Sequence, residues 1–172
     1  MILDAHWDSV LIVDSSLPEE VLSQIESAIK ANKKFEKGIV GGGDPEKTNY
    51  HWSTDSSFKF VEDWLIDSGL IPILQNHDIE ITSRHHQRME GGKMTWHCDG
   101  TYSIAATVYL SSCEGGELEV KSPCRTKSIL IKPSINRIVV IKCDNEHRVL
   151  PVKEGVRDTI QVFFTFIERN EE

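Results

Sequence analysis

The feature that most constrains the fold is a change of hydrophobic pattern near Ile79. From there onward the chain consists of short runs rich in Val, Ile, Thr, Tyr and Phe, separated by Gly, Pro, Asn and Ser. Such runs predict antiparallel strands joined by turns, as in a β-sandwich or barrel. Strands and helices do not alternate in this part, which disfavours a doubly wound parallel sheet. The runs are IEITSRHHQR, SIAATVYL, GELEV, KSILIKP, NRIVVIK and DTIQVFFTFI.

The N-terminal part predicts a strand followed by two helices. An apolar run predicts a strand over Ser9–Val13. Ser16, followed three residues later by Glu19, forms a capping-box pattern, so we expect a helix over about Pro18–Asn32. A second helix is expected within STDSSFKFVEDWLIDSGL, where Gly69 lies near the end. The sequence therefore predicts an α+β protein.

The segment between the two helices, KGIVGGGDPEKTN, breaks all periodicity and predicts a loop. Its three glycines resemble a phosphate-binding loop, but no Gly-Lys-Ser/Thr follows them, so we expect an ordinary surface loop. A long loop of this kind can also cover a substrate. The sequence does not decide whether residues 36–56 do so.

Composition narrows the class of protein. A chain of 172 residues suits one domain, and 39% hydrophobic with 27% charged residues is ordinary for a globular protein. The net charge of −8 opposes binding to nucleic acid. No apolar run is long enough to cross a membrane and the N-terminus does not resemble a secretory signal. We therefore expect a cytoplasmic protein whose four cysteines, none in a CxxC pair, are reduced and buried.

His97 and Asp99, in the segment MTWHCDGT, are candidate metal ligands. In an extended strand residues i and i+2 face the same side, so both side chains would point into the barrel. With a second histidine from elsewhere they would form the two-histidine, one-carboxylate triad of non-haem iron oxygenases. His-x-Asp alone is a weak signal, since a strand-end polar pair also explains it. The chain contains another copy at 6–8, which we interpret as a chance occurrence.

A second group of candidate residues follows about fifty positions later, in EHRVLPVKEGVRDTIQVFF. His147 comes just after an apolar strand, and Arg157 opens another. Arg157 and Thr159 share a face of that strand. A guanidinium beside a hydroxyl is suited to hold a carboxylate, and a buried arginine without an anion would be costly. The alternative is that Arg157 is a solvated residue at the start of a strand.

Taken together, these motifs resemble the Fe(II)/2-oxoglutarate-dependent dioxygenases, especially the prolyl-4-hydroxylase-like branch. The resemblance covers residues from about Arg84 to Phe166 and does not extend convincingly over residues 1–78. The branch has, in order, His-x-Asp, a strand ending Tyr-Leu, Gly-Gly-Glu, a strand ending at Pro, a further strand, His, Pro-Val and Gly-x-Arg. The matching segments here are WHCD, TVYLSSCEGGELEV, ILIKPSINRIVVIK and EHRVLPVKEGVRDT.

The resemblance implies a role for each matching residue. His97, Asp99 and His147 would bind iron, and Arg157 would bind the distal carboxylate of 2-oxoglutarate with Thr159 assisting. Tyr109 could reach the same carboxylate, although a core aromatic residue explains it equally well. Branch members often have a tyrosine shortly before the first ligand histidine. This chain has Gln87 there, which could still contact 2-oxoglutarate.

Three neighbouring residues have less defined roles. His85 and His86 are adjacent, so at most one can face into the barrel. Arg88 is the nearby basic residue that could contact a substrate.

The resemblance also implies a fold: a double-stranded β-helix, or jelly roll, of antiparallel strands with N-terminal helices packed against it. We expect one domain over residues 1–172, with helical support over 1–78 and the jelly-roll core over 79–169.

The implied activity is hydroxylation of a C–H bond with release of succinate and CO2, by an enzyme that uses Fe(II), 2-oxoglutarate and O2, with ascorbate as a candidate additional reductant. The substrate would be a peptidyl proline, or alternatively a free amino acid or another small molecule. A non-catalytic jelly-roll binding module is the alternative from another class. No nucleic-acid or membrane partner is expected, and the oligomeric state stays open.

Overall fold

The structure is a computed structural model that describes residues 10–31, 36–37, 50–53, 58–122, 124 and 126–167, with only the backbone described for 36–37 and 50–53. The N-terminal elements are β1 (Val10–Asp14), α1 (Glu19–Ala31), β2 (Glu36–Lys37), β3 (Tyr50–Ser53), α3 (Lys59–Asp67) and the 3-10 helix η2 (Pro72–Asn76). The strands that follow are β4 (Asp78–Arg88), β5 (Met94–His97), β6 (Ile104–Tyr109), β7 (Glu114–Gly115), β8 (Leu118–Lys121), β9 (Ser128–Ile131), β10 (Arg137–Lys142), β11 (His147–Val149), β12 (Val152–Glu154) and β13 (Arg157–Ile167).

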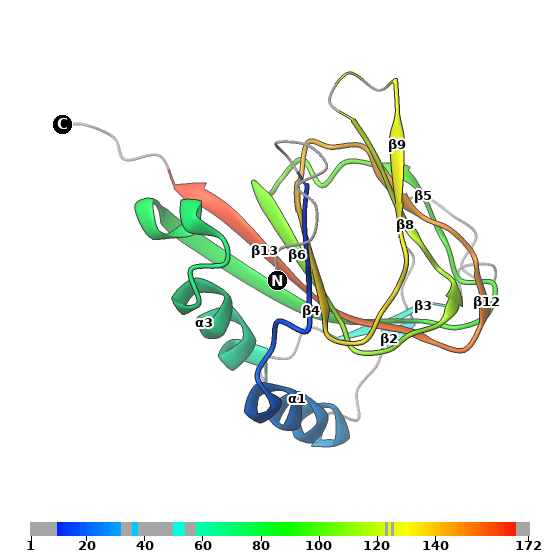
Figure 1. Cartoon of the computed structure of the whole chain (residues 1–172), viewed down its shortest axis with the longest axis horizontal. Coiled ribbons are helices and arrows are strands. Elements are labelled where there is room, and N and C mark those ends of the chain that lie inside the picture. The colour runs from blue at the N-terminus through cyan, green and yellow to red at the C-terminus, as the bar shows by residue number, and fades with distance from the viewer. Residues whose placement is uncertain are drawn as a thin grey trace.

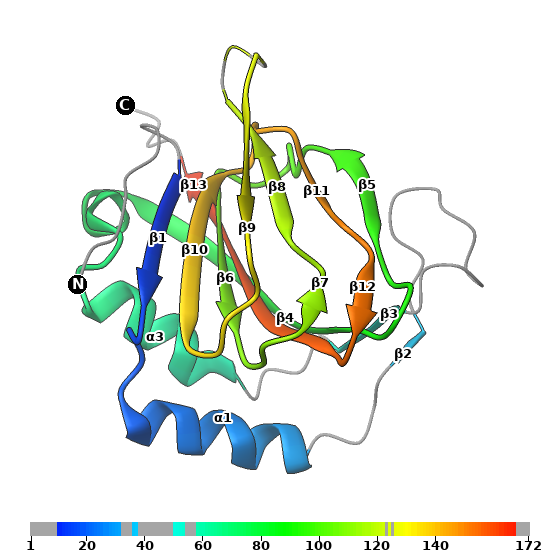
Figure 2. The same ribbon diagram turned by 45° about the vertical axis from the view of Figure 1, so that its right-hand side comes forward.

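The strands form two sheets that face each other, plus a small β12-β7 pair (Figures 1 and 2). The larger sheet has the order β1-β10-β6-β13-β4-β3-β2 and the smaller has the order β5-β11-β8-β9. The strand pairings within them are antiparallel. Helices α1 and α3 lie on the outer side of the larger sheet, away from the smaller one (Figure 1). This is the jelly-roll arrangement expected from the sequence, and the α+β class is confirmed.

Strand β13 separates two hydrophobic cores because its side chains alternate between the faces of the larger sheet. Ile160, Val162 and Phe164 pack with the residues of α1 and α3 in one core. Phe163 packs in the other core, between the two sheets, with Tyr109 of β6 and residues of β8 and β10. Residues of β13 that lie an even number of positions from Phe163, such as Arg157 and Thr159, therefore face the interior between the sheets.

The N-terminal predictions agree with the structure in most respects. The helix expected over Pro18–Asn32 is α1, and the second expected helix is α3. The expected strand is β1, which pairs with β10 at the edge of the larger sheet. Residues before 79 therefore supply strands as well as helical support. Most of the predicted glycine loop lies outside the described residues.

Two further expectations concern the described part of the chain. No helix there is long and apolar enough to span a bilayer. The four cysteines are free thiols, but the prediction that they are buried is wrong for most of them. Cys143 is buried, Cys113 is half-buried, and Cys98 and Cys124, which lie near or in turns, are exposed.

Candidate metal centre

His97 and His147 are brought together by the pairing of β5 with β11. His97 ends β5, His147 begins β11, and the two are direct cross-strand partners. The next partners are Met94 and Val149, so β5 has one extra residue and the register shifts. A bulge of this kind re-aims a side chain. It lets Met94 and His97, three positions apart, both face the interior.

Asp99 lies just beyond β5 rather than within it. Its backbone N–H donates to the carbonyl of Cys143 at 2.9 Å, and its carbonyl accepts from the N–H of Tyr102 at 2.9 Å. These bonds fix a turn that directs the carboxylate back toward the two histidines. The predicted pairing of His97 with Asp99 thus arises from a turn and not from strand alternation alone.

The three side chains converge on one point. One ligand atom from each of His97, Asp99 and His147 lies within 4.8 Å of the others. Asp99 oxygens lie 3.5 Å from Nε2 of His97 and 3.4 Å from Nε2 of His147. Nε2 of His147 is buried and has no hydrogen-bond partner among the described residues. A buried nitrogen lone pair beside a carboxylate fits a bound cation.

Electrostatics favours the ionisation states that a metal requires. Burial, and then the neighbouring His147, lower the pKa of His97. Burial alone would raise the pKa of Asp99, but the His147 and His97 imidazoles and the Arg84 guanidinium lower it on balance. At neutral pH the site therefore offers a neutral imidazole at His97 and a carboxylate at Asp99, the forms that bind metal ions.

A buried cationic cluster of side chains, called the Arg157 pocket from here on, lies at the start of β13. Arg157 is 3% exposed, its Nε donates to the carbonyl of Gly116 at 2.9 Å, and its terminal nitrogen donates to the hydroxyl of Tyr109 at 3.0 Å. No described carboxylate forms an ion pair with Arg157. Thr159, the cross-strand partner of Tyr109, has a buried hydroxyl without a hydrogen-bond partner among the described residues. Such a group of donors fits an incoming carboxylate.

Gln87 does not join this pocket. It is the cross-strand partner of Asp158, and its side-chain amide donates to that carboxylate at 2.9 Å. Arg157 is one residue away on β13 and therefore faces the opposite side of the sheet. The expectation of a co-substrate contact for Gln87 is thus not supported, because counting residues before the ligand histidine does not determine which face a side chain occupies.

The two adjacent histidines separate as predicted. His86 is the cross-strand partner of Thr159 and shares the inner face. His85 contacts the carboxylate of Asp158 on the outer face and lies edge-on to Phe58.

Sequence reasoning missed residues that orient the ligands and the pocket. Ring nitrogens Nδ1 of His97 and His147 lie 2.8 Å from the carbonyls of Thr95 and Asn145. The carbonyl of Gly116 holds Arg157. Backbone groups carry no residue-type signal, although the Gly-Gly-Glu segment marked the turn that contains Gly116.

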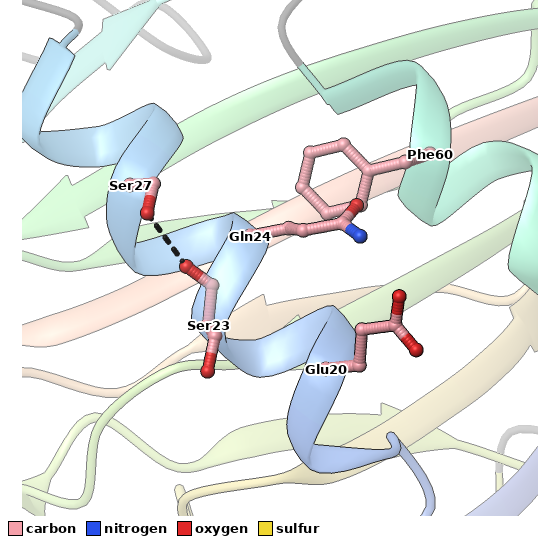
Figure 3. A pocket seen from close by; sticks show the side chains of 5 residues that line it. All are labelled: Glu20, Ser23, Gln24, Ser27 and Phe60. Atoms are coloured by element: carbon pink, nitrogen blue, oxygen red, sulfur yellow. Dashed lines mark hydrogen bonds between the residues drawn. The ribbon is translucent and has the colours of Figure 1, made fainter.

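A surface hollow between α1 and α3 is separate from these residues (Figure 3). It is lined by Glu20, Ser23, Gln24, Ser27 and Phe60, and the hydroxyl of Ser27 donates to the carbonyl of Ser23 at 2.9 Å. With a single titratable side chain and no convergent ligands in this lining, the hollow does not resemble a catalytic site.

Comparison with known proteins agrees with this geometry. The family model of the 2OG-Fe(II) oxygenase superfamily matches residues 83–165, which contain the three converging ligands and Arg157. No match to the chain was found among curated protein sequences.

Solved structures share the fold at low sequence identity. One is a prolyl hydroxylase from Trichoplax adhaerens in complex with a hypoxia inducible factor oxygen degradation domain peptide fragment. It is 18% identical to this chain with a TM-score of 0.74, and the match covers 94% of this chain and 85% of that one. A prolyl-4-hydroxylase from Pseudomonas putida is 13% identical with a TM-score of 0.72, and the match covers 93% of this chain and 94% of that one. The non-heme alpha ketoglutarate dependent epimerase SnoN from nogalamycin biosynthesis is 11% identical with a TM-score of 0.70, covering 92% and 78%.

The family match, the shared fold and the converging His-Asp-His group agree on the class of enzyme, whose members use Fe(II), 2-oxoglutarate and O2. The chain belongs to the 2OG-Fe(II) oxygenase superfamily and is a 2-oxoglutarate-dependent dioxygenase.

Proposed function

We propose that His97, Asp99 and His147 hold Fe(II) and that Arg157 binds the distal carboxylate of 2-oxoglutarate, for hydroxylation of a C–H bond in a peptidyl proline. The observation that carries the metal assignment is the convergence of three ligand atoms within 4.8 Å. Nε2 of His147, which is buried and makes no hydrogen bond among the described residues, agrees with it. Two imidazoles and one carboxylate are the ligand set of non-haem Fe(II) oxygenases.

The Arg157 pocket supports the assignment of the co-substrate. A guanidinium that is 3% exposed needs an anion, and no described carboxylate supplies one. Thr159 offers a hydroxyl whose hydrogen-bonding capacity is unused among the described residues. Tyr109 orients the guanidinium through its hydroxyl and lies under it, with 4.9 Å between the arginine carbon and the ring centroid.

When bound, the metal and co-substrate would supply the oxidising chemistry, in which one C–H bond of the substrate, one O2 and one 2-oxoglutarate are converted to one C–OH group, succinate and CO2. The chain supplies position and charge. The carbonyls of Thr95 and Asn145 hold the imidazoles with Nε2 toward Asp99. Arg157 and Thr159 would fix the far end of the co-substrate.

A peptidyl proline is the proposed substrate because a neighbour of the same fold is in complex with a peptide fragment. A free amino acid or another small molecule is the second candidate, since SnoN, of nogalamycin biosynthesis, has the same fold. A complete ligand set argues against a non-catalytic binding module. The cytoplasmic location, the lack of a nucleic-acid or membrane partner and the use of ascorbate stay predictions.

Aerobic assays with Fe(II) and 2-oxoglutarate test the proposal. Proline-containing peptides and free amino acids would be incubated with enzyme, and succinate release compared with the gain of one oxygen atom in the candidate substrate. We expect wild type to release succinate in step with product and His147→Ala to release none. His77→Ala, at an exposed histidine stacked on Phe166, serves as the matched control and should retain activity. Full activity of His147→Ala would overturn the metal assignment.

A further inference from the structure

The interior face of β4 carries an arginine that no assigned role uses. Arg88 is 2% exposed and is the direct cross-strand partner of Arg157, which is 3% exposed. Like charges directly opposite each other on a sheet destabilise the pair. Two buried guanidinium groups at adjacent inward positions therefore suggest a binding function beyond packing.

The two guanidinium groups extend in different directions. Arg157 reaches toward β6 and β7, where it donates to the Tyr109 hydroxyl and the Gly116 carbonyl. A terminal nitrogen of Arg88 lies 3.6 Å from the sulfur of Met94, on β5. β5 is the strand that ends in His97, three residues further on. Arg88 therefore extends across the interior to the strand that carries His97, whereas Arg157 extends to β6 and to the turn after β7.

The histidine that lies beside these arginines on β4 is uncharged. Burial, followed by the charges of Arg88, Arg84 and Arg157, lowers the pKa of His86 well below its usual value. His86, which lies between Arg84 and Arg88 on the same face of β4, is therefore neutral and adds no charge to the pocket.

We propose that Arg88 is a second co-substrate residue, which binds the carboxylate at the 2-oxo acid end of 2-oxoglutarate while Arg157 binds the distal carboxylate. This inference rests on the proposed function of the site. The co-substrate is a dianion with a carboxylate at each end, and two diverging guanidinium groups on neighbouring strands match that distribution of charge. The pocket then selects a 2-oxo dicarboxylate over either monocarboxylate.

Binding measurements on Mn(II)-loaded protein separate the two arginines without relying on turnover. Three ligands would be titrated calorimetrically: 2-oxoglutarate; 2-oxopentanoate, which lacks the distal carboxylate; and 4-oxopentanoate, which lacks the carboxylate of the 2-oxo acid end. Arg88→Met should weaken the affinities for 2-oxoglutarate and 2-oxopentanoate about ten- to a hundredfold and leave the affinity for 4-oxopentanoate unchanged. Arg157→Met should weaken the affinities for 2-oxoglutarate and 4-oxopentanoate and leave the affinity for 2-oxopentanoate unchanged.

Arg148→Met is the matched control for the loss of one positive charge. Arg148 stacks on Trp96 and pairs with Glu119, so its removal should leave the affinities for all three ligands within about twofold of wild type.

The outcomes distinguish this inference from the proposed function. Affinities of Arg88→Met for 2-oxoglutarate and 2-oxopentanoate within twofold of wild type would overturn the role of Arg88 alone, provided that Arg157→Met is impaired. Failure of the wild type to bind 2-oxoglutarate would overturn the proposed function and this inference together. If Arg88→Met no longer binds Mn(II), Arg88→Lys replaces it. A loss confined to the two 2-oxo acids would then support the proposal, and an equal loss for all three ligands would contradict it.

Discussion

At each candidate ligand histidine, a backbone carbonyl two residues earlier in the chain selects the ring nitrogen that faces the metal position. His97 is oriented by Thr95 and His147 by Asn145, both at 2.8 Å from Nδ1. A proton held on Nδ1 leaves Nε2 with its lone pair, directed toward Asp99. The same local arrangement, repeated on β5 and β11, orients both candidate imidazole ligands.

Thr159 allows binding and stability to be measured as separate effects at one residue. Its hydroxyl is buried and has no hydrogen-bond partner among the described residues. Thr159→Val keeps the shape and removes the hydroxyl, so we expect the free energy of unfolding without ligand to stay equal or rise by about 1 kcal/mol. The affinity for 2-oxoglutarate should fall about tenfold through loss of a charge-assisted hydrogen bond. Denaturant unfolding and calorimetric titration measure the two effects. A variant that is destabilised and binds normally would contradict this role.

At the scale of elements, the pairing of β4 with β13 determines which residues face the site. Each strand has eleven residues, and they are paired along their full length. A shift of one residue would move Arg157 and Thr159 to the outer face. On that outer face Gln87 and His85 both contact Asp158, which helps to hold the observed register.

The turn after β7 supports Arg157 and can be tested by one substitution. Gly116 has a φ of +66°, and a Cβ there would lie 3.2 Å from Cδ of Arg157. Gly116→Ala should therefore displace the guanidinium and weaken 2-oxoglutarate binding about tenfold, while left-handed backbone strain lowers stability by about 1–2 kcal/mol. Gly100→Ala is the control, because an added Cβ there meets nothing within 4 Å. Equal affinities for 2-oxoglutarate in Gly116→Ala and Gly100→Ala would count against the support that we assign to this turn.

An ion pair joins strands β1 and β10, and its contribution to the stability of the fold depends on pH. Arg137 donates to both carboxylate oxygens of Asp14, at 2.6 and 2.9 Å, and the bond from Arg137 lowers the pKa of Asp14 below 3.8. The stabilisation is therefore present above pH 3.8 and is lost as the pH falls through the lowered pKa. Asp14→Asn should reduce the free energy of unfolding by about 1 kcal/mol or less at neutral pH, because the pair is partly exposed. Denaturant unfolding over a pH series measures the difference, which should vanish in acid; a pH-independent difference would contradict the mechanism.

At the scale of the whole molecule, the larger sheet separates two kinds of core. Helices α1 and α3 pack on its outer side (Figure 1). The interior between the sheets holds the candidate metal centre and Arg157. Neighbours only 13–18% identical share this fold over more than nine tenths of the chain. That residues 1–172 act as a single domain stays a prediction.

The sequence predicted the strand-rich half, both helices and the convergence of the ligands, because periodicity and residue type carry those features. It could not predict the face occupied by Gln87, since that depends on the register of β4 against β13. The sequence also could not predict the bulge in β5 or the carbonyls that orient the histidines, because both depend on backbone geometry. Arg88 was recognised only as a nearby basic residue; its position opposite Arg157 required the pairing of the strands.

We propose that His97, Asp99 and His147 form an iron centre that binds 2-oxoglutarate. The most direct measurement is an anaerobic titration of metal-free protein with Fe(II) and then 2-oxoglutarate, recording the weak visible charge-transfer absorption of a chelated 2-oxo acid. We predict that the band appears in the wild type and is absent from His97→Ala. Absence of the band from the wild type, or a band of equal strength in His97→Ala, would contradict the account.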